Sequence, residues 1–170
     1  MPPSHRVLQR QGKKEEARAT LNARLEANPH TRAAYERLIA LEEEAGEHED
    51  LDTFVRGKKV GYDVRPLIEE NRTLVPIRAL VDALGAEIAW NAETQVVTIS
   101  KDGKTIELTI GSNIAKVDGV EVELDAPAKI VEGNRTVVPI RFVSQGLGLY
   151  VKWLAEQRTI LVTEEPVADE

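Results

Sequence analysis

One stretch of this sequence occurs twice, and that repeat constrains the fold more than any other feature. The first copy reads RTLVPIRALVDALG over residues 72–85 and runs on to Trp90. The second reads RTVVPIRFVSQGLG over residues 135–148 and runs on to Trp153. The offset between the copies is constant at 63 residues (135 − 72, 141 − 78 and 153 − 90). Tandem copies of one segment predict two similar structural units.

Each copy carries the signals of strands around one short helix. Pro76 suits the first turn of a helix, where its missing N–H costs nothing, and Gly85 suits the helix end. The apolar residues between them follow a helical spacing. Asp118-Gly119 is a strong signal for a two-residue β-hairpin turn, because both central positions need positive φ. We therefore predict an α+β fold: an N-terminal helical hairpin, then a duplicated unit of antiparallel strands curled around one short helix each, packed together or sharing strands.

The first third of the chain, from residue 6 to about 55, has a helical pattern. Leu21 and Leu25 are four residues apart and fall on one helix face, and Asn28-Pro29 ends that helix. Gly46 ends the second helix. The spacing of glycine, alanine, leucine and proline resembles a tetratricopeptide repeat; a plain helical hairpin is the alternative. Such a hairpin cannot bury its own apolar face, so it should dock on its own β domain, a neighbouring repeat or another protein.

These patterns divide the chain into three segments. Residues 1–52 form a tetratricopeptide-like helical hairpin, and residues 53–164 form the duplicated β region. Within that region the first unit covers about 54–116 and the second about 117–163. Residues 165–170 form an acidic tail.

Composition excludes several functions. The formal net charge of the 170 residues is −7, so a nucleic-acid partner is not expected, because phosphate binding needs a basic face. No cysteine is present, which removes disulfides and thiolate metal sites. No apolar run approaches the roughly 20 residues that span a bilayer, so no membrane span is expected. The first residues lack the apolar core of a signal peptide, so the chain is either cytoplasmic or a mature or trimmed form.

The two repeated stretches resemble the signature of the copper amine oxidase N-terminal-like domain, also called the stalk domain. The resemblance covers roughly residues 54 to 163, while the helical segment lies outside the motif. It implies a small sheet curled around a helix, without catalytic residues, in exported or cell-surface proteins of Gram-positive bacteria. We therefore expect an extracytoplasmic location, with the signal peptide not present in this chain.

No catalytic, cofactor-binding or metal-binding residue is predicted. The three histidines, His5, His30 and His48, all lie in the helical segment and lack the spacing of a copper site. We expect them to be exposed at the surface. No serine lies in a nucleophile context, and no histidine in the β region is available as a base.

The polar and aromatic residues that recur in register are the candidate ligand or structural residues. Two roles are open for the arginines: a repeated cationic site for an anionic polymer, or ties between the helix start and carboxylates within the same unit. Two roles are open for the tryptophans as well: a sugar-stacking pair, or core anchors that cover the helix. The structural role is favoured in both cases. These residues are Arg72, Arg78, Trp90, Arg135, Arg141 and Trp153.

The function expected from the sequence is a non-catalytic structural or protein-interaction module, not an enzyme. The helical segment would bind a protein partner or the chain's own β domain. The alternative is a carbohydrate or cell-wall binding module that uses the repeated tryptophans and arginines, if they are exposed. A weaker alternative is an accessory domain that completes an enzyme.

Overall fold

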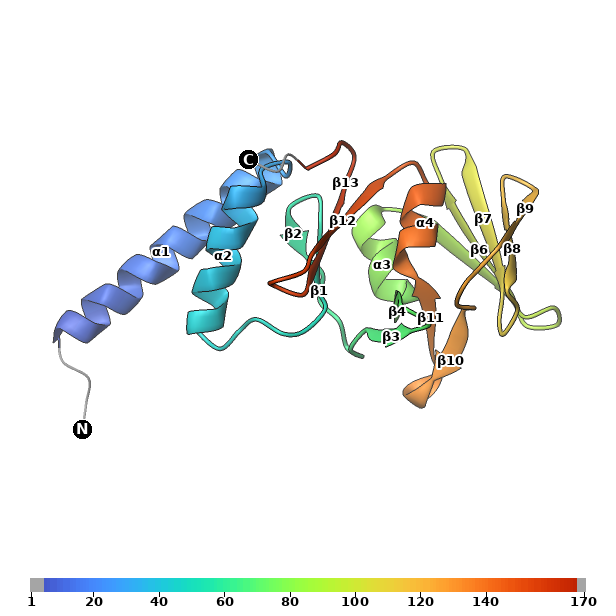
Figure 1. Ribbon diagram of the computed structural model, residues 1–170, viewed down its shortest axis with the longest axis horizontal. Coiled ribbons are helices and arrows are strands. Elements are labelled where there is room, and N and C mark those ends of the chain that lie inside the picture. The colour runs from blue at the N-terminus through green and yellow to red at the C-terminus, as the bar shows by residue number, and fades with distance from the viewer. Residues whose placement is uncertain (1–4, 168–170) are drawn as a thin grey trace. The chain divides into compact units, whose positions relative to one another are not determined.

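The computed structural model describes residues 5–167 and has an α+β fold, as predicted (Figure 1). Two helices come first, followed by three sheets with short helices between their strands. The chain divides into two compact units, which we call the terminal unit (Met1–Lys59 with Lys152–Glu170) and the central unit (Val60–Val151). The domain boundary predicted near residue 52 stays a prediction.

The terminal unit begins with two packed helices. They are α1 (His5–Ala27) and α2 (Arg32–Glu44). Helix α1 ends just before Asn28-Pro29, as predicted, and Gly46 follows α2 with φ 71°. The prediction of helix up to about residue 55 is wrong, because the chain turns after Glu44 and resumes as a strand at Asp52.

A four-stranded sheet completes the terminal unit. Its order is β12-β13-β1-β2, from strands β1 (Asp52–Val55), β2 (Lys58–Lys59), β12 (Tyr150–Leu154) and β13 (Thr159–Thr163). Leu21 and Leu25 of α1 join one buried cluster with Phe54 of β1 and Leu161 of β13. The apolar face of the helix pair is therefore buried against the chain's own β strands, which removes it from water.

The central unit contains a curled five-stranded antiparallel sheet with the order β5-β6-β7-β8-β9. Its strands are β5 (Glu87–Asn91), β6 (Val96–Lys101), β7 (Lys104–Thr109), β8 (Ile114–Val117) and β9 (Val120–Glu123). The predicted turn at Asp118-Gly119 joins β8 to β9 with φ values of 51° and 85°. These angles are the positive values that a type I′ hairpin requires.

A second sheet of the central unit displays the duplication directly. Its order is β10-β11-β4-β3, from β3 (Leu67–Glu69), β4 (Arg72–Pro76), β10 (Lys129–Val131) and β11 (Arg135–Pro139). The 3₁₀ turn η1 (Glu132–Asn134) precedes β11. Strands β4 and β11 pair antiparallel with Val75 opposite Val138, two residues that the 63-residue offset relates. A local two-fold symmetry therefore relates the copies at this pair of strands.

The repeated motif turns from strand to helix at its proline in both copies. Helix α3 (Ile77–Leu84) follows β4, and α4 (Ile140–Gly146) follows β11. Helix α3 packs on β4, β5 and β11, and α4 packs on β4, β7 and β11. The inward residues Ile77, Leu80, Val81 and Leu84 are buried, which fixes α3 on the strands.

The copies share strands. Hairpin β8–β9 is the second-copy counterpart of hairpin β1–β2 (114 − 52 = 62), so that copy begins a few residues before the predicted 117. This hairpin extends the sheet formed by β5–β7 of the first copy. In the terminal unit, hairpin β1–β2 of the first copy pairs with β13 of the second. Among the described residues no strand follows β13 as β7 follows β6, and β13 pairs with β1 directly and in parallel. Two strands separated by one antiparallel neighbour run in the same direction, which accounts for this parallel pair.

Candidate functional site

The structure places all six predicted residues at the surface. Trp90 is 49% exposed and Trp153 is 37% exposed, so the prediction that they anchor the core is wrong. Both lie on edge strands, β5 and β12, which have a neighbouring strand on one side only. Side chains near the end of such a strand are not covered by a second neighbour. The four arginines Arg72, Arg78, Arg135 and Arg141 are exposed as well.

Two of these arginines form ion pairs that cross between the copies. The Arg72 guanidinium binds Asp125, with 2.9 Å between Nε and Oδ2. The Arg135 guanidinium binds Asp63, with 2.9 Å from Nε and 2.7 Å from Nη2 to Oδ2. Asp63 and Asp125 occupy matching places in the two copies (125 − 63 = 62). The prediction of arginine ties within one unit is therefore wrong: each arginine binds the aspartate of the other copy.

The other two arginines occupy the second position of each short helix. Arg78 and Arg141 each follow the isoleucine that begins α3 or α4. Within residues 5–167, neither has an ion-pair or hydrogen-bond partner. Their charges are therefore available to a ligand.

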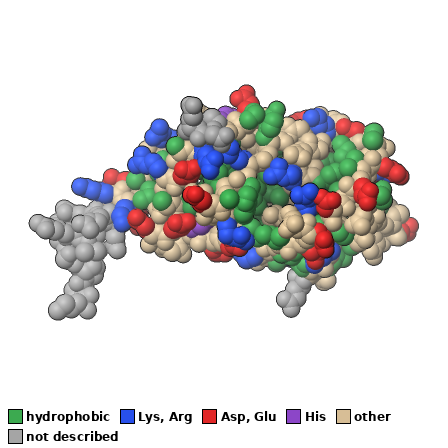
Figure 2. Space-filling model, in the orientation of Figure 1, with side chains coloured by type: hydrophobic (Ala, Val, Ile, Leu, Met, Phe, Trp, Pro, Cys, Tyr) green, Lys and Arg blue, Asp and Glu red, His purple; other side chains and the backbone are tan. Residues whose placement is uncertain are grey.

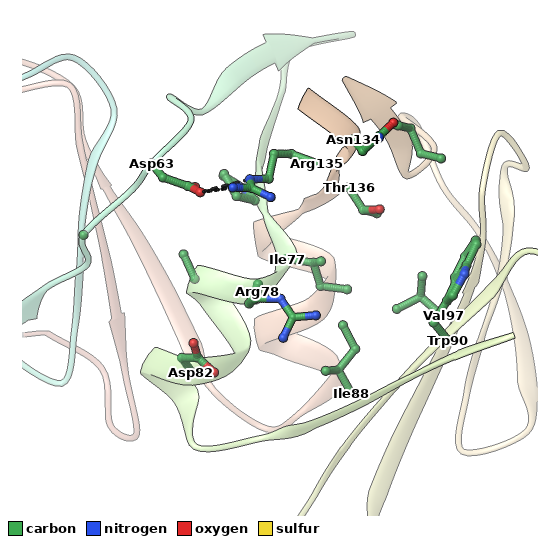
Figure 3. Close-up of a pocket in the computed structure, with 14 residues that line it drawn as sticks. Asp63, Ile77, Arg78, Asp82, Ile88, Trp90, Val97, Asn134, Arg135 and Thr136 are labelled. Atoms are coloured by element: carbon green, nitrogen blue, oxygen red, sulfur yellow. Dashed lines mark hydrogen bonds and ion pairs between the residues drawn. The ribbon is translucent and has the colours of Figure 1, made fainter. Parts of the chain in front are cut away.

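Arg78 lies in a groove of about 640 Å³ in the central unit (Figure 3). One wall is α3, another is formed by β5 and β6, and the third is formed by the chain from β10 to β11. The lining residues include three of the six predicted ones. They are Gly61, Asp63, Pro76, Ile77, Arg78, Ala79, Asp82, Ile88, Trp90, Val97, Ile130, Asn134, Arg135 and Thr136.

The charges of this groove are unevenly arranged. Figure 3 shows the Arg78 guanidinium in the middle of the groove, on the side of Ile88, whereas Asp82 lies on the opposite side of Arg78. The Arg135 charge is balanced by Asp63. Arg78 is thus a cation beside an apolar wall, and Trp90 supplies an open indole at the far end of that wall.

The matching positions of the second copy do not form an equivalent arrangement. The Arg158 guanidinium lies 5.8 Å from the centre of the Trp153 ring and covers it. Asp50 binds Arg158 and raises the pKa of its guanidinium by hydrogen bonding and by charge. At the positions that match Ala79 and Asp82, the second copy has Phe142 and Gln145. The first copy alone combines an open indole with a groove-facing arginine in the described part of the chain.

A buried polar cluster in the terminal unit was not predicted. The side chain of His48 is only 7% exposed, so the prediction of surface histidines is wrong at this position. Its Nδ1 lies 3.3 Å from Asp52 Oδ2, and its Nε2 lies 3.0 Å from the Gln157 carbonyl oxygen. Lys59 binds both Glu42 and Asp52. These contacts join α2 to the sheet, which gives the cluster a structural role. His30 is partly exposed, and the side chain of His5 lies outside the described residues.

Two further observations limit the chemistry of the described residues. No three His, Cys, Asp or Glu side chains in that part of the chain are grouped closely enough to hold a metal ion. None of its helices combines the length and the apolar character needed to cross a bilayer. On the face drawn in Figure 2, acidic and basic side chains are intermingled.

The chain is a duplicated α+β module, and its central unit carries an open groove lined by apolar and charged side chains. The chain belongs to the copper amine oxidase N-terminal domain family, whose model matches residues 54–162. The match begins within β1 and ends within β13, so it includes both copies and leaves out the helix pair.

Two curated relatives are distantly similar. A protease inhibitor of Brevibacillus choshinensis is 28% identical over 99 residues, which cover 58% of this chain and 30% of the relative. A primary amine oxidase of Klebsiella aerogenes is 30% identical over 64 residues, which cover 38% of this chain and 8% of the relative. This chain thus spans less than a third of the length of either relative.

Proposed function

We propose that this chain is a non-catalytic binding module of an exported or cell-surface bacterial protein, and that its groove binds carbohydrate of the cell wall. The observation that carries the proposal is the open indole of Trp90 in the same groove as the Arg78 guanidinium, which has no partner among the described residues. An exposed aromatic ring offers a flat apolar face, and the polar groups around it fix the orientation of a ligand.

The carboxylates of the groove support a non-catalytic role. Glycoside hydrolysis ordinarily uses two carboxyl groups on either side of the scissile bond. Here Asp63 is bound by Arg135, and Asp82 lies on the other side of Arg78 from the apolar wall. Binding without turnover therefore agrees best with this arrangement.

The extracytoplasmic location belongs to the same proposal and rests on the family. Fractionation of the source bacterium with an antibody against this chain tests it. Signal in the wall or culture medium supports the location, and signal in the cytoplasm alone contradicts it.

A sedimentation assay with purified peptidoglycan and wall polysaccharide tests carbohydrate binding. We expect the chain to be retained at low salt and Trp90→Ala to lose about fivefold to tenfold in affinity, because stacking on one aromatic ring contributes about 1–1.4 kcal/mol. Trp153→Ala is the matched control, since Arg158 covers that ring. No retention of the unmodified chain, or equal retention of Trp90→Ala, would contradict the proposal.

The helix pair has a more limited role in this proposal. Its inner face is buried against β1, β12 and β13, so we propose that, despite its tetratricopeptide-like spacing, it caps the chain's own β sheet. Light scattering after gel filtration tests this: a monomer agrees with a cap, and a dimer that dissociates when Leu41 is changed to Glu contradicts it.

Protease inhibition is a second candidate, favoured by the similarity to the Brevibacillus protein. Residual activity of trypsin and subtilisin with increasing amounts of the chain tests it directly. Stoichiometric inhibition that survives Trp90→Ala would favour this function over carbohydrate binding.

A further inference from the structure

We infer that the groove selects a glycan in which single acidic groups alternate with neutral sugars, with one sugar ring on Trp90 and the neighbouring acidic group on Arg78. This inference rests on the proposed carbohydrate function and adds the class of ligand. The acidic group is a carboxylate or a phosphate ester, since a guanidinium binds both in the same planar geometry.

The first argument is the charge state of the groove. Of the two arginines in it, Arg135 is neutralised by Asp63 at 2.7 Å, whereas Arg78 has no partner in residues 5–167. The possible local partner, Asp82, is one helical turn further along α3 and forms no ion pair with Arg78. Figure 3 shows the Arg78 guanidinium on the side of Ile88 and the Asp82 carboxylate on the opposite side of Arg78. A single positive charge is therefore presented to the ligand.

The second argument is the surroundings of that charge. Ile88 and Val97 form the wall next to Arg78, and Trp90 continues it along the same strand pair. An apolar wall lowers the local dielectric constant, so an oxyanion gains more from this guanidinium than from one that is fully in water. On the opposite wall, Asn134 and Thr136 supply neutral polar groups that suit sugar hydroxyls.

The third argument sets the density of acidic groups. The whole chain carries a formal charge of −7, so a densely charged polyanion is repelled over the Debye length of about 10 Å at 0.1 M salt. One cation in the groove compensates one acidic group and not a continuous row of them. A sparsely acidic glycan gains the local contact and avoids most of the repulsion.

Titration of Trp90 fluorescence tests the inference. Trp153→Phe leaves Trp90 as the single indole and keeps an aromatic ring beside Arg158. The probes are a hyaluronan tetrasaccharide, in which uronate alternates with a neutral sugar, a neutral chitin tetrasaccharide, and a poly(glycerol phosphate) teichoic acid. We expect the hyaluronan fragment to bind about tenfold more tightly than the chitin fragment, because one charge-assisted contact contributes about that factor.

Two variants separate the roles of the arginines. Arg78→Gln should abolish the preference for the acidic fragment and keep the weaker binding of the neutral one. Arg141→Gln, at the matched exposed position on α4, should leave the preference unchanged. Circular dichroism of both variants verifies that they are folded.

The outcomes separate this inference from the proposed function. Equal affinity for the two tetrasaccharides overturns the inference and leaves carbohydrate binding intact. Failure of all three probes together with failure of the wall sedimentation assay overturns both. A tighter, Arg78-dependent complex with the teichoic acid identifies phosphate as the acidic group and overturns the argument on density. An acidic peptide, titrated in the same way, is the control for binding of a protein partner, and stronger binding of this peptide than of any glycan overturns the inference as well.

Discussion

Tyr35 on helix α2 is fully buried, and its hydroxyl donates a hydrogen bond to the Pro29 carbonyl oxygen at 2.8 Å. Burial raises the pKa of this hydroxyl far above its ordinary value, because the charged form would lose its hydration. In the unfolded chain the same group loses its proton near pH 10. The folded state then holds a proton that the unfolded state has released, so the free energy of unfolding should fall as pH rises above about 10.

Tyr35→Phe isolates this effect. The variant should lose about 1 kcal/mol at pH 8, the ordinary contribution of one hydrogen bond. Its stability should then decline less steeply than that of the unmodified chain between pH 9.5 and 11. Urea unfolding curves of both proteins across this range measure the difference. Parallel declines would show that Tyr35 ionises as readily in the folded state as in the unfolded one.

Lys59 on strand β2 compensates two buried carboxylates. Its Nζ lies 3.2 Å from Asp52 and also binds Glu42, and both acidic side chains are less than 10% exposed. Lys59→Met should destabilise the chain by about 2–3 kcal/mol, because the two buried carboxylates then lose the cation that they share. Lys58→Met changes the exposed neighbour and should stay within about 0.5 kcal/mol. Equal losses in thermal unfolding of the two variants would contradict the assigned role of Lys59.

The sequence pattern selected residues, but it did not predict their surroundings. It singled out Arg78, Trp90 and Arg135, and these three residues line one groove. It failed on exposure, because a tryptophan in a strand pattern is usually buried, and only the strand order shows that β5 is an edge. The sequence could not predict the partner of Arg135 either, since Asp63 lies far away in the sequence and belongs to the other copy.

At the scale of elements, the two hairpins of the duplication offer a matched comparison. Both turn through a glycine with strongly positive φ, 82° at Gly57 and 85° at Gly119. A Cβ at Gly57 would lie 2.1 Å from the Leu25 carbonyl oxygen at the end of α1, whereas nothing lies within 4 Å of a Cβ at Gly119. The first hairpin can therefore pack closely against helix α1 only because residue 57 has no side chain.

Gly57→Ala should consequently be far more damaging than Gly119→Ala. Both variants should lose about 1–2 kcal/mol of folding free energy, because a residue with a side chain is strained in the left-handed backbone conformation. Gly57→Ala must in addition displace a backbone carbonyl, and we expect a total of about 4 kcal/mol or more. Chemical denaturation at neutral pH measures both. A difference below about 1 kcal/mol would mean that α1 can move away from the turn freely.

Local elements were predictable where their signals are local. The turn at Asp118-Gly119 and the end of α1 at Asn28-Pro29 follow from short-range backbone preferences. The short helices begin directly after Pro76 and Pro139, which end strands β4 and β11, and not at the prolines themselves. The pairing of β1 with β13 could not be predicted in this way, because local sequence signals do not specify a strand partner some hundred residues away.

At the scale of the whole molecule, duplication has produced two unequal halves. The sheet of the central unit has all five strands, with β7 between β6 and β8. In the terminal unit no counterpart of β7 follows β13 among the described residues, and β13 pairs with β1 instead. The terminal unit is thus assembled from both ends of the chain, and its helix pair depends on residues from β12 and β13 such as Leu154 and Leu161.

This assembly predicts that a core substitution in β13 also destabilises helices α1 and α2. Leu161 is fully buried in the cluster that holds α1 and α2, so Leu161→Ala should destabilise the terminal unit by about 3 kcal/mol. Leu108 on β7 is equally buried within the central unit, which makes Leu108→Ala the matched control. Both changes remove the same atoms from a core.

Hydrogen exchange of the full chain, followed by mass spectrometry, distinguishes the two responses. Leu161→Ala should speed exchange in α1, α2 and β1 as well as in β13, because these elements lose their common core. Leu108→Ala should speed exchange chiefly in β6, β7 and β8. If either variant accelerated exchange to the same extent along the whole chain, the two units would unfold as one, and the division at residues 59 and 152 would have no energetic meaning.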